Sequence, residues 1–304
     1  MKKLIGNEKL KKTIAEYIKC SRLPQAIIIE GEQGLGKHTA AAYIAAAALC
    51  KSENAPCLNC DTCRTVLEKN HTDIKYYAPE KSTFTVDMAR AIRTEAYLKP
   101  LTSDYNIAIL EHCELMNAEA QNALLKVLEE PPESALFILL TENAGAFLTT
   151  VLSRCLLLRV TPLSNEEVSN YLESETDKSP EEVLPAVMLS EGNIGKALMF
   201  LDDEDTEEIR QLSKRFYTNL CDKNSIELLK CAYEAEKFGA RIEVLKILYE
   251  TIFTELKVSN GDKKRGLIEA AEAVSFAIER LNANGNKSVV LNNMCQKLIK
   301  ASKY

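Results

Sequence analysis

The chain has 304 residues, 46% of them hydrophobic, and its 38 basic and 44 acidic residues give a net charge of −6. This length predicts about two or three domains with true hydrophobic cores. The acidic balance disfavours DNA binding over the whole surface, so any DNA contact is expected to be local or to come from partners. Because no apolar run approaches about 18 residues and the start lacks a signal-peptide pattern, a cytoplasmic location without membrane contact is expected.

The first half of the chain alternates between helical and strand patterns. Apolar residues recur at helical spacing over residues 2–20, and residues 26–29 form a short β-branched run typical of a strand buried on both faces. Further helices are predicted at residues 39–49, 86–98 and 118–129, and further strands at residues 74–78, 107–110, 136–141 and 155–160. This alternation predicts a parallel sheet covered by helices.

Beyond Pro162 the strand patterns end, and the rest of the chain has helical patterns separated by polar or glycine-containing segments. The sequence therefore predicts an α/β domain over residues 1–161, a small helical domain over residues 162–203 and a second helical domain over residues 204–304. The acidic stretch at residues 202–208 is expected to form a linker. Apolar positions within residues 238–256 are candidates for contacts between subunits, although a helix that fills its own bundle has the same pattern.

A phosphate-binding loop is predicted between the first strand and the next helix. Residues 31–37 fit the pattern G-x-x-x-x-G-K, although a simple glycine turn would also connect these elements. Glycines let backbone N–H groups approach a phosphate, and Lys37 supplies a positive charge. The hydroxyl residue that normally follows this lysine and binds Mg²⁺ is replaced by His38, and Thr39 lies about 100° further round the helix. The glycines of the pattern are Gly31, Gly34 and Gly36.

The acidic part of a nucleotide site is expected after the strand at residues 107–110, where the sequence has Glu111 and His112. Glu111 can approach a magnesium ion. His112 stands where an ATPase carries the carboxylate that activates water, and an imidazole does not easily replace it with the same geometry. The departures at His38 and His112 predict doubtful binding of ATP and Mg²⁺ and little hydrolysis.

Four cysteines follow the pattern C-x6-C-x2-C-x2-C, which suits a closed tetrahedral zinc site. Four thiolates leave no open coordination position, so the sequence predicts a structural zinc ion. Chance clustering is the alternative, and His71 is a weaker candidate ligand. The other six cysteines are expected to be small buried apolar side chains. The predicted zinc ligands are Cys50, Cys57, Cys60 and Cys63.

The order of these motifs resembles the clamp-loader branch of the AAA+ proteins. Residues 122–132, NALLKVLEEPP, are similar to a helix and turn shared by bacterial gamma/tau and delta-prime subunits of DNA polymerase III. The similarity is close over about the first 160 residues, loose over the small helical domain, and limited to helical character in the last 100. It implies an AAA+ P-loop domain with a zinc-knuckle insertion at residues 50–63, a helical lid domain and a C-terminal helical collar domain.

The resemblance also implies roles for single residues. Arg154, in the triplet S-R-C, matches the family's arginine finger, which stabilises charge on phosphates bound by a neighbouring subunit. Thr141 matches the polar residue that senses the γ-phosphate. Lys196 falls where active members have a sensor arginine, and a lysine lacks the bidentate geometry of arginine. These departures favour delta-prime over gamma/tau.

The family resemblance then implies a pentameric loader of the sliding clamp onto primed DNA. Its partners would be gamma/tau and delta subunits, with the clamp and primer–template DNA contacted indirectly, and its own ATP hydrolysis would be small or absent. One alternative is an active gamma/tau-like ATPase, in which His38 and His112 are tolerated. Another is a zinc-knuckle protein that binds nucleic acid alone, which the acidic balance disfavours.

Overall fold

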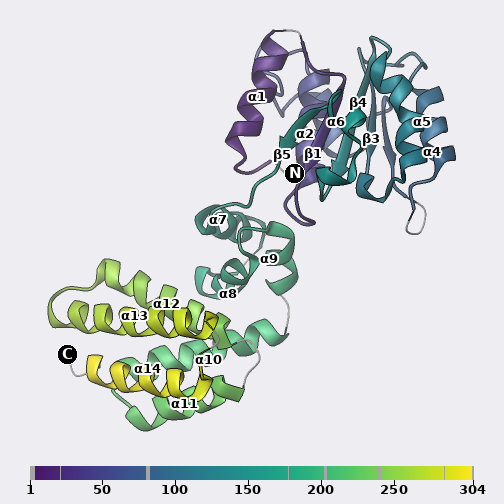
Figure 1. Ribbon diagram of the computed structural model, residues 1–304. Helices are drawn as coiled ribbons and strands as arrows, with labels where there is room; N and C mark the ends of the chain where they lie inside the picture. Colours follow the sequence, from purple (N-terminus) through teal and green to yellow (C-terminus); the bar gives the residue numbers. More distant parts are fainter. Residues whose placement is uncertain are drawn as a thin grey trace. The chain divides into compact units, whose positions relative to one another are not determined.

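We describe the protein from a computed structural model of the chain (Figure 1). The structure describes residues 4–20, 22–79, 83–176, 178–201, 204–237, 241–283 and 285–302. Two compact units result: unit 1 comprises Met1–Leu163 and Asn193–Gly195, and unit 2 comprises Ser164–Gly192 and Lys196–Tyr304. None of the helices in these described ranges is long and apolar enough to span a membrane.

Unit 1 is an α/β structure with a parallel sheet whose strand order is β2-β3-β4-β1-β5. The predicted parallel sheet covered by helices is therefore confirmed. Its elements are α1 (Glu8–Lys19), β1 (Ala26–Glu30), α2 (Lys37–Leu49), α3 (Asp61–Leu67), β2 (Ile74–Tyr77), α4 (Val86–Glu95), β3 (Asn106–Leu110), η1 (Cys113–Leu115), α5 (Ala118–Glu129), β4 (Ala135–Thr141), η2 (Ala144–Ala146), α6 (Thr149–Leu152) and β5 (Leu156–Arg159).

Several boundaries differ from the sequence prediction, two of them more than the others. The first helix was expected from residue 2, but residues 2 and 3 lie outside the described ranges, and α1 begins at Glu8. Gly6 and Asn7 have φ angles of 54° and 53°, a left-handed backbone that a right-handed helix cannot contain. The helix predicted to reach residue 98 ends at Glu95, where a 3.0 Å hydrogen bond from Leu98 N to the Glu95 carbonyl begins a tighter turn.

The sheet separates two hydrophobic cores. Side chains alternate across a strand, so Ile27 and Ile29 of β1 enter the core with α1 and α2, whereas Ile28 enters the core with α4 and α5. Figure 1 shows these helix pairs on opposite sides of the sheet. Both Ile28 and its neighbours in β1 are fully buried, which explains why this strand is an unbroken apolar run.

The end of β1 is tied to the ends of β4 and β5. Gly31 N donates to the Thr141 carbonyl at 3.1 Å, and the Glu30 carboxylate accepts from Ala144 N at 2.8 Å and from Arg159 Nε at 2.6 Å. The hydrogen bond from Arg159 is the main cause that lowers the pKa of Glu30. These contacts fix the residue from which the glycine-rich loop departs.

Unit 2 is helical. Its elements are α7 (Asn165–Glu175), α8 (Pro180–Ser190), α9 (Ile194–Leu201, whose first two residues belong to unit 1), α10 (Glu204–Cys221), α11 (Ser225–Lys237), α12 (Arg241–Val258), α13 (Gly261–Asn282) and α14 (Lys287–Ala301). Helix α8 packs against α10 and α12, so the segments predicted as two helical domains lie in one compact unit. The division into lid and collar domains stays a prediction.

The predicted linker at residues 202–208 is wrong in its described part. Residues 202 and 203 lie outside the described ranges, and residues 204–208 form the first turns of α10. Residues 238–240 of the predicted contact segment also lie outside them. Of the rest, most apolar side chains of α12 fill the unit's own core, whereas Phe253 is 44% exposed.

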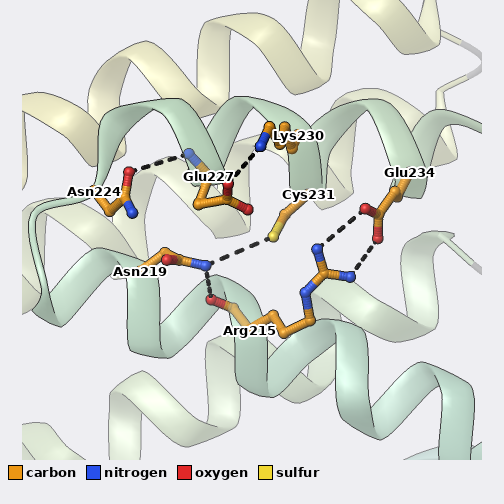
Figure 2. A network of polar contacts seen from close by, with 7 residues as sticks. All are labelled: Arg215, Asn219, Asn224, Glu227, Lys230, Cys231 and Glu234. Atoms are coloured by element: carbon orange, nitrogen blue, oxygen red, sulfur yellow. Dashed lines mark hydrogen bonds and ion pairs between the residues drawn. The ribbon is translucent and has the colours of Figure 1, made fainter.

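A polar network joins α10 to α11 on the surface of unit 2 (Figure 2). The Arg215 guanidinium makes two bonds to the Glu234 carboxylate, at 2.6 and 3.1 Å. Asn219 Nδ2 donates to the Arg215 carbonyl at 2.8 Å and lies 4.0 Å from the buried Cys231 sulfur. A bidentate pair of this kind gives geometric specificity, although exposed ion pairs contribute only about 0–1 kcal/mol.

A buried carboxylate fixes the loop before β3. Asp73 accepts hydrogen bonds from the backbone N–H groups of Leu101, Thr102 and Ser103 at 2.6 to 2.9 Å, and from the hydroxyls of Thr102 and Ser103 at 2.8 Å. Burial alone would raise the pKa of Asp73, but these bonds outweigh it and hold the pKa well below the usual value. The loop is therefore anchored to the start of β2 by one charged group.

We expect Asp73→Asn to lower the free energy of unfolding by about 1–3 kcal/mol at neutral pH. The reason is that the charged carboxylate that accepts these hydrogen bonds is lost. Folding lowers the pKa of Asp73, so the stabilisation is fully present above the unfolded-state pKa of about 3.9. It is lost as the pH falls through the folded-state pKa. Urea unfolding at several pH values measures this. The exposed Asp104→Asn is the matched control, and an equal loss for both variants would contradict the anchoring role.

Candidate functional site

The glycine-rich loop leaves β1 at Glu30 and enters α2 at Lys37. Gly34 and Gly36 have φ angles of 89° and 96°, which other residues adopt only with strain. Asn193 Nδ2 donates to the Gln33 carbonyl at 2.8 Å, and a Cβ on Gly34 would collide with the Asn193 side chain. The loop thus has the backbone shape that the motif predicts and is covered by a polar side chain.

Lys37 bonds to its own loop. Its ammonium donates to the Gly31 carbonyl at 2.6 Å. Burial lowers the pKa of Lys37, while the carboxylates of Glu142, Glu114 and Glu32 oppose this shift. This one bond leaves N–H groups of the ammonium for a phosphate, but these carboxylates would repel the phosphate.

His38 and Glu111 contact each other at the end of the sheet, with His38 Nδ1 3.3 Å from Glu111 Oε1. Burial lowers the pKa of His38, and the Glu111 charge partly opposes this. The positions from which the motif predicts two oxygen ligands of Mg²⁺ therefore hold an imidazole and a carboxylate in mutual contact. Imidazole is a poor ligand for magnesium, which prefers oxygen.

His112 is held by Glu114, a residue that the sequence motifs did not single out. His112 has a left-handed backbone with a φ of 53°, and its Nδ1 lies 3.3 Å from Glu114 Oε1. Burial disfavours the Glu114 charge, but hydrogen bonds from the backbone N–H groups of Glu114 itself and of Glu142 hold its pKa below the usual value. The structure thus adds a carboxylate near Lys37, two residues after His112.

The remaining predicted nucleotide-site residues are spread over three elements. Thr141 is fully buried at the end of β4, where its hydroxyl donates to the Asn143 carbonyl at 3.1 Å and accepts from Asn143 N at 3.2 Å. Thr39 lies in the first turn of α2, after His38. Lys196 lies in α9 and belongs to unit 2. Gly31 joins Lys37 to Thr141, because its carbonyl accepts from Lys37 and its N–H donates to the Thr141 carbonyl.

The four cysteines of the insertion form a cluster at the end of α2 and the start of α3. Their sulfur atoms all lie within 4.8 Å of one another, and the Cys50–Cys60 and Cys57–Cys63 sulfurs are 4.0 Å apart. Tetrahedral zinc with bonds of about 2.3 Å needs sulfurs about 3.8 Å apart, so the geometry fits. The cluster could hold a structural metal ion.

Backbone N–H groups point at the sulfurs of this cluster. Cys57 N donates to Cys50 Sγ at 3.5 Å, and Cys63 N donates to Cys60 Sγ at 3.4 Å, where the sulfur also caps α3. Bonds from the N–H groups of Asn59 and Cys60 lower the pKa of the Cys57 thiol to about 6, whereas burial raises the pKa of Cys63. Such N–H groups favour thiolates, the form in which cysteine binds metals.

The prediction that the other cysteines are buried is only partly right. Cys20 and Cys221 are exposed, and the other four are buried or half-buried. The two exposed cysteines lie at the C-terminal ends of α1 and α10, where the helices reach the surface.

Arg154 follows the short helix α6 and is exposed. Its Nη1 donates to the Thr150 carbonyl at 2.8 Å, and its Nη2 lies 2.9 Å from Glu129 Oε1. Ser153 Oγ donates to the same Thr150 carbonyl at 3.1 Å. Cys155 packs against the core shared by α4 and α5, and burial raises the pKa of its thiol to about 12. The triplet thus consists of a turn residue, a surface cation and a core anchor.

The family model described as "DNA polymerase III, delta subunit" matches residues 6–164. The chain is 33% identical to DNA polymerase III subunit delta′ of Bacillus subtilis over 56% of this chain and 51% of that protein. It is 25% identical to subunit delta′ of Buchnera aphidicola over 90% and 82%, and 30% identical to subunit gamma of the same organism over 75% and 62%. The matched part thus spans about half of the B. subtilis relative.

We expect the chain to bind about one equivalent of zinc through the four cysteines. Cys60→Ser should abolish the retention of zinc after dialysis, because Cys60 lies in the cluster. Cys20→Ser should not, because Cys20 lies outside it. Elemental analysis of both variants measures this. Since binding displaces thiol protons, affinity should fall as pH is lowered. Equal zinc content in both variants would contradict the assignment.

We expect His38→Thr to create Mg²⁺-dependent binding of a nucleotide, because a hydroxyl would replace the imidazole that faces Glu111. The variant should bind the nucleotide more tightly with Mg²⁺ than without it, because Mg²⁺ prefers oxygen ligands. Calorimetric titration with a non-hydrolysable ATP analogue, with and without Mg²⁺, measures it. Adding Thr39→Ala to this variant should change nothing, and a variant that binds no better than wild type would show that the loop fails for another reason.

Proposed function

The chain belongs to the family described as DNA polymerase III, delta subunit, and on this premise we propose that it has the delta-prime role in the bacterial clamp loader. In this role it helps to load the sliding clamp onto primed DNA as a member of a hetero-oligomer. The relatives named delta′ support this, one of them over 90% of the chain. Its activity then appears within a complex.

The proposed contribution to catalysis is Arg154, donated to the ATP site of a neighbouring gamma/tau subunit. The guanidinium side chain is 36% exposed, is permanently charged, and follows a short helix whose last turn is fixed by Ser153. An arginine that reaches a neighbour's phosphates stabilises the charge that develops during hydrolysis. This exposed, braced arginine is the observation on which the proposal chiefly rests.

We further propose that the chain's own phosphate loop hydrolyses little or no ATP. His38 and Glu111 contact each other at the place where Mg²⁺ would bind. His112 has no carboxylate with which to activate water. Glu114 and Glu142 add negative charge near Lys37. The proposed role of the loop is therefore structural and not catalytic.

The other proposed parts are a structural zinc ion in the four-cysteine insertion and a collar in residues 204–304 that joins the ring. Exposed apolar residues on α11 support a contact surface in this region: Ile226 and Tyr233 are 69% and 59% exposed. Gamma/tau and delta subunits are the proposed partners, since one relative of this chain is named gamma. The clamp and primer–template DNA would be reached through the complex.

A second candidate function is an active gamma-like ATPase, which the similarity to subunit gamma favours. ATP turnover by the isolated chain separates the two, because only this candidate requires it. A zinc knuckle that binds nucleic acid alone has less support, since Arg64, the residue after the insertion, pairs with Asp61. That candidate requires salt-dependent DNA affinity without partners.

We expect Arg154→Ala to lower the DNA- and clamp-stimulated ATPase rate of a loader reconstituted with gamma/tau and delta. Arginine fingers contribute about 10³ to 10⁵ in kcat at their own site, so loss of one site among several should be visible in the total. Steady-state ATPase rates of the intact complexes measure the change.

Arg159→Ala is the matched control, because Arg159 is also exposed and ion-paired, at Glu30. An unchanged rate for Arg154→Ala in an assembled complex would overturn the finger role. Failure of the wild-type chain to form any complex with these subunits would overturn the delta-prime role itself.

A further inference from the structure

The guanidinium of Arg154 is braced by a residue 25 positions earlier in the chain. Its Nη2 lies 2.9 Å from Oε1 of Glu129, the last residue of α5. The two side chains are 36% and 45% exposed. The contact therefore joins the end of one helix to the turn that follows another, on the surface of unit 1.

Glu129 lies where a carboxylate is unfavourable unless a cation balances it. The C-terminal end of a helix has a partial negative charge, so an acidic side chain in the last turn of α5 is disfavoured, typically by about 0.3–1 kcal/mol. Glu130, the next residue, is exposed and adds a second negative charge. Arg154 offsets this repulsion at Glu129. The local helix preference thus does not explain an acid at this position, whereas the ion pair does.

The contacts of Arg154 leave room for a ligand. A guanidinium has five N–H groups. Its Nη1 donates to the Thr150 carbonyl and to Ser153 Oγ, at 2.8 and 3.2 Å, and its Nη2 uses one N–H toward Glu129. Two N–H groups, on Nε and Nη2, remain beyond these contacts of the described residues. Two parallel N–H groups are what a bidentate grip on phosphate oxygens requires.

We infer that Glu129 is a positioning residue for Arg154: it holds the guanidinium so that the remaining N–H groups face the phosphates of the neighbouring subunit. This inference rests on the finger role proposed above. Arginine has a long side chain with large rotamer freedom, and holding it in place beforehand reduces the entropy lost when it meets its ligand. The effect should appear in kcat and not in ATP binding, because the brace acts on the transition-state contact.

The test uses the reconstituted loader with gamma/tau copies whose own finger arginine is replaced by alanine, so that Arg154 supplies the finger that is measured. In this complex Glu129→Ala should lower the stimulated kcat about threefold to fivefold, the factor to which an exposed pair of up to about 1 kcal/mol corresponds. The KM for ATP should not change. Glu129→Gln, which keeps an oxygen acceptor of the same length, should recover part of the loss, and Glu130→Ala should have no effect.

A double-mutant cycle distinguishes positioning from a general effect on the fold. In the Arg154→Ala background, Glu129→Ala should cause no further fall. If Glu129→Ala lowers kcat as much in that background as alone, the inference is overturned while the finger role stands. The same holds if Arg154→Ala lowers kcat and Glu129→Ala leaves it unchanged. If Arg154→Ala does not change kcat in the intact complex, the finger role fails. The Arg154→Ala variant alone shows this, without any Glu129 variant.

Discussion

The burial of β1 on both faces is the constraint on which the arrangement of unit 1 depends. Ile27 and Ile28 point into different cores, so the strand cannot shift by one residue without exchanging the two sets of side chains. Its pairing with β4 and β5 is thereby fixed, and Glu30 stands beside Thr141 and Arg159 in the register. The glycine-rich loop, the strand end with Thr141 and the chain leading from Arg154 into β5 all take their positions from this one strand.

The charges at this edge of the sheet give the proposed low ATPase activity its physical basis. A working site pairs a lysine and a metal ion with phosphates, and its carboxylates act through the metal. Here Lys37 already bonds to its own loop, His38 contacts Glu111, and Glu114 binds His112. Lys37, His38 and His112 thus each contact a group of the protein itself, and the added carboxylates would repel a phosphate.

Much of the fold and part of the candidate site could be predicted because their signals are local. The C-x6-C-x2-C-x2-C spacing keeps the four thiols within one short segment, and the apolar run of β1 identifies a strand buried on both faces. The pairings of Asp73 with Leu101 and of Glu129 with Arg154 had no such signal, because they join positions 28 and 25 residues apart. Such contacts depend on how the strands and helices pack. The acidic residues 204–208 suggested a linker by composition, yet the apolar Ile209 and Leu212 that follow bury one face of α10.

The surroundings of Arg154 indicate why an arginine would be presented from this position. Ser153 and Arg154 share the Thr150 carbonyl, which fixes the turn after α6, and Cys155 secures the chain in the core before β5 begins. A finger on a freely moving loop would lose the entropy of the whole loop on meeting a phosphate, whereas one on this turn loses mainly that of its own side chain. Glu129 reduces that remaining freedom from the end of α5. In the proposed role the subunit would contribute to a neighbour's site through this rigid support, because what it would supply there is one charge at a defined place.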